Sequence, residues 1–504
     1  MSSSSCKFLT LFLFHLLLSN IRISQSLPCP LPPAIQSIYT ENPATVAAAS
    51  VDFGNVVHDR PIGVFVPRTV EDIIALVKTS YECYQPFTIG VNGHAHSTHG
   101  QSMALNGVVI DMKQMRINGA IKVGVSDTAV TADVGGDTLW LDVMNYVLGL
   151  GYSPYSWTDY LNLTVGGTLS NAGISGQTFK HGPQISNVQE LDIVTGKGEL
   201  VFCSPIENPE LFYGALGGLG QFGIIVNARI PLGRPTPTRV RWQLILFSNF
   251  TSFTQTQEKI ITSDIVVSYL EGGMLLDNGT PNTWRTFFFP SSDIPKITAL
   301  TKQFGVLYSI EYVSYYDGFG KKTMDRKMKQ LFRTLNANPE YSYEKDATYK
   351  DFLLRVEATE PNSQAHPWLN MFIPKSGISA FESGVVRDIL LKRNITLGPI
   401  IFYPMKKEKW DDRMSAVVPD EDIFYTLGLL YETGPHSLQE YEDQNAAILK
   451  FFEGAGINIK LFLGNQPNKD GWIKHFGPKW GTFQQRKAQF DPKNILSPGQ
   501  RIFN

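Results

Sequence analysis

The sequence predicts an α+β fold built from two or three packed units. Strand-like and helix-like segments alternate in short stretches, which favours α+β over one regular parallel sheet. The chain has 504 residues, more than a single hydrophobic core normally serves. Charged residues make up 18% and aromatic residues 12% of the chain, as in ordinary globular proteins rather than disordered ones.

Residues 1–26 have the pattern of a secretory signal peptide. Lys7 precedes the apolar run 8–18, which is short for a bilayer span, and small residues for cleavage follow at Ser24-Gln25-Ser26. A membrane anchor is the alternative interpretation. Secretion implies an apoplastic or vacuolar destination with no membrane contact after cleavage. Four glycosylation acceptors fit this route, although the first lies in a candidate site and is expected to stay unmodified: Asn162, Asn249, Asn278 and Asn394.

The first half of the chain contains short elements bounded by glycines. A capping pattern of Thr69 with Asp72 begins a predicted helix with an apolar face. The predicted elements are a helix over 69–79, strands over 87–89, 108–112 and 129–134, a helix over 137–148, and a hairpin of 192–194 with 200–202.

Three prolines within 231–237 mark a boundary, and a predicted strand at 240–247 follows. We therefore divide the mature chain into a domain over 27–235 with its core at about 60–235, a second domain over 236–456, and a C-terminal segment over 457–504.

The net charge bears on whether the protein binds nucleic acid, and the cysteine content limits the number of disulfides. The net charge is −2 and no long basic run occurs, which argues against a nucleic-acid partner. Removal of the leader leaves Cys29, Cys83 and Cys203, enough for at most one disulfide, and the sequence does not choose the pair. The sequence gives no indication of oligomeric state.

The first candidate site is the glycine-rich stretch 90–101, which holds three of the nine histidines. Glycines let a backbone approach a bulky ligand and present N–H groups to phosphates, and a histidine there can attack an electrophilic cofactor carbon. A metal site and a plain polar loop are the alternatives. No second acidic or cysteine cluster completes a metal shell in the sequence.

The second candidate site, 157–173, places Asp159 between two aromatic residues and before a turn rich in small residues. Apolar neighbours would raise the proton affinity of this carboxylate, as a general base requires. The alternative is that Asp159 only caps a helix or turn.

A third motif, Gly218-x-Gly220-x-x-Gly223, matches a dinucleotide-binding pattern in spacing alone. That pattern should open a helix, whereas the strand-like Ile224-Ile225-Val226 follows here. We therefore predict a close-packed bend.

Together these motifs resemble the cytokinin oxidase/dehydrogenase family, which belongs to the vanillyl-alcohol-oxidase type of FAD proteins. The resemblance covers the whole mature chain. The motifs that carry it are Trp157-Thr-Asp-Tyr-Leu161 with 164–173, 217–223, His366-Pro-Trp-Leu-Asn370, Asp491-Pro492 and 495–500. It implies a two-domain fold of that type, with an FAD-binding domain and an α+β substrate domain.

The resemblance also implies roles for individual residues. FAD would be attached covalently to His96. Asp159 and Glu271 would be the catalytic residues, Asp159 as the base, and both would contact the substrate. Trp368, Asn370 and Leu463 would lie near the substrate. The expected flavin contacts are Val91, Gly93, His94, Ala95, Ser97, Gln101, Asp159, Thr164, Ser170, Ile174, Ile224, Phe462, Ser497 and Gln500.

Three departures from the family pattern affect the flavin pocket. Ala95 replaces a glycine before the attached histidine, and alanine is strained there if the backbone needs a positive φ. Val91-Asn92 replaces an arginine-glycine pair, and 462–465 differs from the family's Tyr-Leu-Pro-His run. No cysteine near Asp159 provides a second flavin link, so a single link is expected.

The implied reaction oxidises the N6-isoprenoid side chain of a cytokinin to an imine, which hydrolyses to adenine and an aldehyde. The cofactor carries the redox chemistry and passes electrons to oxygen or a quinone. The alternatives are an oxidase of the same fold acting on an alcohol or sugar, and a non-catalytic cytokinin-binding protein. The yellow absorbance of a flavin-loaded protein separates enzyme from binding protein.

Overall fold

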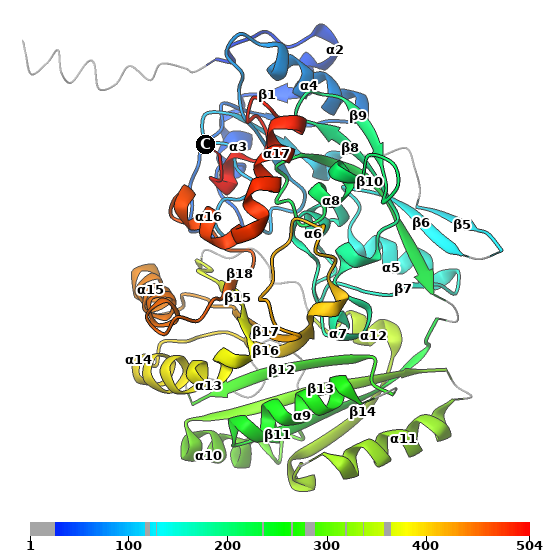
Figure 1. The fold of residues 1–504 in the computed structure, drawn as a ribbon, viewed down its shortest axis with the longest axis vertical. Coiled ribbons are helices and arrows are strands. Elements are labelled where there is room, and N and C mark those ends of the chain that lie inside the picture. Colours follow the sequence, from blue (N-terminus) through cyan, green and yellow to red (C-terminus); the bar gives the residue numbers. More distant parts are fainter. Residues whose placement is uncertain are drawn as a thin grey trace, which may run out of the picture.

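A computed structural model describes residues 26–503 except 116–120, 128, 234–235, 264–265, 278–287, 318–319, 336 and 357–363. Residues 1–25 of the predicted signal peptide and the acceptor Asn278 lie outside the described residues. No helix within the described ranges is long and apolar enough to cross a membrane. Figure 1 shows two halves stacked along the long axis, with the N-terminal elements in the upper half and the largest sheet in the lower half.

Two sheets form the upper half. The first has the order β1-β2-β4-β3, with β2, β4 and β3 parallel. Its strands are β1 (Tyr39–Thr40), β2 (Gly63–Phe65), β3 (Ile89–Asn92) and β4 (Val108–Asp111). The second is antiparallel, with the order β5-β6-β10-β8-β9 and β7 beside β10. Its strands are β5 (Lys122–Val125), β6 (Val130–Gly135), β7 (Ser153–Pro154), β8 (Glu190–Thr195), β9 (Leu200–Cys203) and β10 (Gly223–Gly233).

The predicted elements of this half form with shifted ends. Helix α4 (Val70–Glu82) begins at the predicted cap, where the Thr69 side chain and Asp72 make a capping box, and it runs three residues past its predicted end. The predicted strand 87–89 is observed at 89–92, and the predicted helix 137–148 is α5 (Trp140–Gly149). The hairpin of β8 and β9 is confirmed, with Gly198 at φ 76° in its turn.

The proline-rich boundary begins inside a strand. Pro231 belongs to β10 and pairs with Thr131 of β6, while the pairing of β10 with β8 ends at Arg229. A proline lacks the N–H that a strand paired on both sides would use, and here only one side is paired.

The lower half contains an antiparallel sheet of the order β14-β11-β13-β12-β16-β17-β15-β18. Helices α9, α10 and α11 contact strand β13 of this sheet. The strands are β11 (Arg239–Phe247), β12 (Tyr269–Leu276), β13 (Val306–Tyr316), β14 (Ser342–Thr348), β15 (Leu369–Pro374), β16 (Ile400–Lys406), β17 (Ile423–Leu429) and β18 (Lys460–Leu461).

Helices connect the sheets. In the upper half they are α2 (Pro33–Gln36), α3 (Pro43–Ala48), α6 (Val165–Asn171) and α8 (Pro209–Ala215), while α7 (Thr178–His181) contacts strand β16 of the lower sheet. In the lower half they are α9 (Phe250–Thr262), α10 (Ile294–Phe304), α11 (Lys321–Thr334), α12 (Tyr349–Leu353), α13 (Ile378–Ala380), η5 (Phe381–Leu390), α14 (Leu391–Arg393) and α15 (Leu438–Gly454).

The C-terminal segment returns to the upper half. After β18, helices α16 (Lys469–Phe476) and α17 (Trp480–Phe490) lead back, and Figure 1 shows the C-terminus beside α17 and α3. Leu496 then bridges Ile89 of β3. This return brings the motif at 495–500 next to the loop that holds the three histidines.

One disulfide joins Cys29 to Cys83, and Cys203 is free and buried. The structure thus selects the pair that the sequence left open. The bridge ties the residues before α2 to the end of α4. Burial raises the pKa of the Cys203 thiol to about 12, so this thiol is unreactive near neutral pH.

Candidate functional site

Asp159 lies where the upper half meets the large sheet of the lower half. Its Oδ1 accepts a hydrogen bond from Arg355 Nη2 at 2.5 Å and lies 2.9 Å from the hydroxyl of Tyr269 in β12. That hydroxyl also contacts Glu271, two residues along the same strand. These four residues, Asp159, Tyr269, Glu271 and Arg355, are called the Asp159 cluster below.

The Asp159 cluster differs from the apolar surroundings expected for Asp159. Its carboxylate faces a guanidinium and a phenol, because residues distant in sequence converge on it. The side chains of Arg355 and Glu271 are 4% and 3% exposed, whereas that of Asp159 is 20% exposed. Asp159 is therefore the most accessible of these three side chains, and Glu271 is the most buried.

Both halves hold the chain segment before Asp159. The backbone N–H of Trp157 donates to Gln177 Oε1 at 2.7 Å, and its indole N–H donates to the hydroxyl of Tyr349 at 3.0 Å. Gln177 in turn donates to the hydroxyl of Tyr315 in β13 at 2.8 Å. This fixing of Trp157 limits the positions that the Asp159 carboxylate can adopt.

His96 lies inside a group of aromatic rings. It stacks on Phe53 at a centroid distance of 4.1 Å, and Tyr160 and Trp368 lie 4.9 Å and 6.0 Å away. Burial, with smaller contributions from His94 and His366, lowers the pKa of His96 to about 3. The imidazole is therefore neutral at ordinary pH, as a nucleophile must be. Tyr160 follows Asp159 directly, so the two candidate sites adjoin.

The loop around His96 suits an anionic cofactor. The described residues offer no hydrogen-bond acceptor to the backbone N–H groups of His94, His96, Ser97 and Thr98, nor any partner to the His96 ring nitrogens. Successive unpaired N–H groups form a concavity that binds phosphates. Flavin adenine dinucleotide, which has a pyrophosphate and an electrophilic carbon, fits this donor set.

Ala95 adopts φ 53°, the left-handed region in which glycine is unstrained. Its N–H donates to Asn92 Oδ1 at 2.6 Å, and its carbonyl accepts from the N–H of Phe53 at 2.9 Å. These bonds hold the turn despite the side chain. The backbone at Ala95 thus has the positive φ at which alanine was expected to be strained.

Several predicted flavin contacts converge on this loop. A Cβ at Gly93 would lie 2.4 Å from Thr164 Oγ1. This close approach brings the first candidate site into contact with the second. Gln101 Nε2 donates to the Leu463 carbonyl at 3.0 Å. Gly499 packs so closely that a Cβ there would lie 2.0 Å from the Gly100 carbonyl. The loop thus gathers residues from three distant parts of the chain.

Other predicted contacts lie around the glycine-rich bend at 217–223. The Ser497 hydroxyl donates to the Gly220 carbonyl at 3.0 Å, and the Leu219 N–H donates to the Ser170 carbonyl at 2.8 Å. Strand β10 begins at Gly223, directly after the bend. This confirms that the GxGxxG spacing does not open a helix here.

The remaining predicted site residues occupy several environments. Trp368 Nε1 donates to the Tyr431 carbonyl at 3.1 Å, and the Asn370 carbonyl accepts from the Phe462 N–H at 3.0 Å. Leu463 is 37% exposed. Three other predicted contacts pack in or against the apolar cores: Val91, Ile174 and Ile224. Three more are partly or fully buried in or near the His96 loop: His94, Ser97 and Gln500.

The structure places in the site three further residues that no sequence pattern had indicated. Tyr269 is two positions from Glu271, and the alternation of side chains along a strand could have placed both on one face. No motif or spacing near Arg355 or Phe53 in the sequence indicates that either residue belongs to the site. Arg355 contacts Asp159 from 196 positions along the chain.

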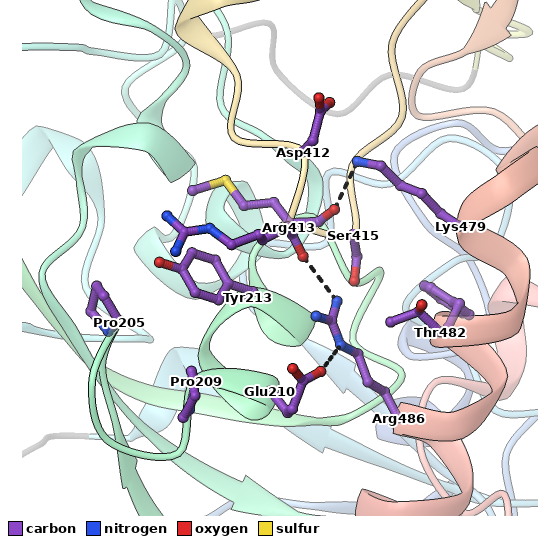
Figure 2. A pocket seen from close by; sticks show the side chains of 12 residues that line it. Pro205, Pro209, Glu210, Tyr213, Asp412, Arg413, Ser415, Lys479, Thr482 and Arg486 are labelled. Atoms are coloured by element: carbon purple, nitrogen blue, oxygen red, sulfur yellow. Dashed lines mark hydrogen bonds and ion pairs between the residues drawn. The ribbon is translucent and has the colours of Figure 1, made fainter.

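A separate cavity of about 470 Å³ lies among α8, α17 and the 410–418 loop, and none of the predicted site residues lines it (Figure 2). Burial lowers the pKa of Lys479 at its wall to about 8. Lys479 donates to the carbonyls of Met414 and Ala416, and Arg486 binds Glu210. Lys479 and Arg486 thus already bind protein oxygens. Within the described ranges, no group of three or more His, Cys, Asp or Glu side chains is arranged to hold a metal ion.

Known proteins resemble the chain over nearly its whole length. Residues 237–503 match the family described as "Cytokinin dehydrogenase 1, FAD and cytokinin binding", and residues 61–204 match an FAD binding domain. Cytokinin dehydrogenase 3 of Arabidopsis thaliana is 45% identical over 471 residues, 92% of this chain and 90% of that protein. Cytokinin dehydrogenase 5 of Oryza sativa subsp. japonica is 45% identical over 484 residues, with coverage of 92% and 90%.

Solved structures share the fold at low identity. A chitooligosaccharide oxidase superposes with a TM-score of 0.69 at 13% identity, covering 94% of this chain and 97% of that one. A VAO-type flavoprotein from Myceliophthora thermophila C1 gives a TM-score of 0.65 at 15% identity, covering 87% and 79%. These likenesses confirm the predicted vanillyl-alcohol-oxidase-type fold.

Proposed function

The chain belongs to the cytokinin dehydrogenase family, and we propose that Asp159 is the base of its cytokinin oxidation and His96 the point of flavin attachment. The protein is an FAD-dependent oxidoreductase that degrades cytokinins. The observation that carries the assignment of Asp159 is its position. It is the partly exposed carboxylate at the junction of the two halves, one residue from the ring that lies against His96.

The reaction removes two hydrogens from the cytokinin side chain, one from the nitrogen and one from the carbon bonded to it. The N–H bond breaks and its proton passes to the Asp159 carboxylate, while the electron pair of that bond forms the C=N bond of the imine. The adjacent carbon loses a hydride, and bound FAD would supply the two-electron acceptor for it. Water then adds to the imine, which gives adenine and an aldehyde. A positioned base contributes about 10²- to 10⁴-fold to such a step.

His96 is proposed to bind the flavin covalently. Its ring is neutral, stacked and without a hydrogen-bond partner within the described residues, so a ring nitrogen is available to form a bond. The test is acid precipitation of the purified yellow protein. We expect the flavin to stay with the wild-type polypeptide and to be released from His96→Ala. Release from His94→Ala instead would move the attachment point, and loss of all flavin from the wild type would exclude a covalent bond.

The substrate side of the pocket is proposed to include Trp368, Asn370, Leu463 and Glu271. Trp368 contacts Phe53 and lies near His96, which places an apolar wall beside the cofactor loop. Trp368→Ala should raise KM for isopentenyladenine by about 10-fold, the loss expected for part of one buried aromatic contact, with flavin content unchanged. Unaltered KM and kcat would remove Trp368 from the pocket.

We also propose that the protein is secreted to the apoplast or vacuole and is glycosylated. The Cys29–Cys83 disulfide supports this route, because disulfides form in the secretory pathway and are rare in the cytosol. Asn249 and Asn394 are exposed, as glycan acceptors must be. Expression with a C-terminal tag, followed by N-terminal sequencing and glycosidase treatment, tests cleavage near residue 26 and the glycans. A tagged protein that keeps residue 1 and remains in the cytosol would exclude secretion.

The electron acceptor is proposed to be oxygen or a quinone, which an oxygen electrode and a quinone-reduction assay distinguish.

A further inference from the structure

Arg355 is held in one place before it meets Asp159. It follows helix α12, and its Nη1 donates to the Phe352 carbonyl at 3.1 Å. Its guanidinium carbon lies 4.4 Å from the centre of the Phe352 ring and 4.6 Å from that of Tyr269. A planar guanidinium held against two rings loses little further freedom when it binds a carboxylate.

The two oxygens of Asp159 are not equivalent. The Arg355 Nη2 and the Tyr269 hydroxyl both approach Oδ1. Among the residues that the structure describes, no donor contacts Oδ2. One oxygen is therefore fixed by the protein and the other is left to meet a substrate.

We infer that Arg355 is a positioning residue for the reaction: together with Tyr269 it occupies Oδ1 of Asp159 and thereby presents Oδ2 to the N–H of the cytokinin. This inference rests on the proposed role of Asp159 as the base. It assigns to Arg355 no contact with substrate or cofactor, and its effect on the rate passes through Asp159.

The charges around the cluster determine the expected pH effect. Glu271 and Tyr269 of β12 face Arg355, and Tyr315 of β13 and Tyr349 of α12 lie nearby. Glu311 of β13, opposite Glu271, bonds to Trp242. Burial raises the pKa of Tyr349 to about 12 and holds that of Tyr315 well above its usual value, so both phenols stay neutral. Loss of the Arg355 cation makes a neighbouring carboxylate hold its proton to a higher pH.

The experiment is anaerobic stopped-flow reduction of the bound flavin by isopentenyladenine between pH 5 and pH 9. In Arg355→Met the acid limb of the pH–rate profile should move to higher pH, because the variant lacks the cation that binds the Asp159 carboxylate. Arg355→Lys should keep the limb near its wild-type position, because it keeps the charge. Its rate should fall by about 10-fold, because two different guanidinium nitrogens bind the Phe352 carbonyl and Oδ1, and the single nitrogen of lysine does not reproduce that fork.

A double variant separates positioning from packing. If Arg355 acts through Asp159, adding Arg355→Met to Asp159→Asn should slow the reaction by less than about 3-fold further, far from additive. The matched control is Arg241→Met, since Arg241 is another buried arginine that binds a carboxylate, Asp346, at 2.7 Å. It should lower the unfolding temperature and leave the pH profile unmoved. The flavin absorbance and unfolding temperature of each variant report folding independently of activity.

An unmoved acid limb in a folded, flavin-loaded Arg355→Met protein overturns the inference. The inference is also overturned if Arg355→Met slows the reaction by the same factor in the wild type and in Asp159→Asn. If Arg355→Met does not fold, a wild-type rate in Arg355→Lys overturns it. Asp159→Asn at the wild-type rate is a different result, because it rejects the base itself. A slow Asp159→Asn with a normal Arg355→Met rejects only the role of Arg355.

Discussion

Two cation–carboxylate pairs in this protein differ in how completely they are satisfied. In the C-terminal ion pair, Lys487 and Asp491 are 3% and 0% exposed. Lys487 binds one oxygen of Asp491 and the Gln221 backbone and side chain, and the N–H groups of Ile495 and Leu496 donate to the two Asp491 oxygens. In the Asp159 cluster, by contrast, one carboxylate oxygen has no described partner.

The difference shows how a structural ion pair is distinguished from one that takes part in a reaction. Both pairs are held by neighbours and both lie beside predicted flavin contacts. The Asp491 carboxylate is fully buried and both its oxygens accept hydrogen bonds from the protein, so the C-terminal ion pair serves to hold the 495–500 turn against β3. The open oxygen of Asp159 leaves a place for a proton from the substrate.

The largest expected effect is on the reaction rate in Asp159→Asn. This change keeps the shape and removes the basic oxygen, so flavin reduction by isopentenyladenine should slow by about 10² to 10⁴-fold, or about 3 to 5 kcal/mol of barrier. Flavin content should not change. Stopped-flow absorbance measures the rate. A folded, flavin-loaded variant that reduces at nearly the wild-type rate would make Asp159 a structural cap, whose loss costs about 1 kcal/mol of stability instead.

The second prediction concerns stability in Asp491→Asn. The change leaves the buried Lys487 ammonium without its carboxylate, which should lower the free energy of unfolding by about 3 kcal/mol. Denaturant unfolding measures this loss. The pH–rate profile of the remaining folded protein should match the wild type, and a shifted profile would contradict the contrast between the two pairs.

The third prediction concerns Tyr269→Phe, which removes one of the two contacts to Oδ1 and keeps the ring. A hydrogen bond to a charged group contributes about 1.5 kcal/mol, so the rate of flavin reduction should fall by about 10-fold. The unfolding temperature should change little because the ring still packs on Phe352. An unchanged rate would show that Arg355 alone fixes Asp159.

The smallest expected effect is a gain in stability from Ala95→Gly. Relief of the left-handed conformation favours the folded state by about 1 to 2 kcal/mol, and the greater freedom of glycine in the unfolded chain offsets about 0.4 to 1 kcal/mol. The net gain should be about 0.5 to 1 kcal/mol in denaturant unfolding, with covalent flavin intact. A loss of stability would show that the alanine methyl packs in the loop.

Much of the framework could be predicted from the sequence because its signals are local. The capping box of α4 needs only residues three apart, and the bend before β10 follows from glycines next to a strand-like run. The resemblance to the cytokinin dehydrogenase family, carried by several long motifs in order, is confirmed over most of the chain. The α+β class and the two-domain flavoprotein fold are confirmed as well.

What the tertiary structure decided depends on residues that are far apart in the sequence. It chose Cys83 as the partner of Cys29 and brought Phe53 onto His96. It replaced the expected apolar surroundings of Asp159 with Arg355, 196 residues away. A lone arginine gives no periodic or spacing signal, and its contacts are set only when α12 packs against β12. The sequence alone thus indicated Asp159, but the packing of the two halves determined which of its oxygens is free to act.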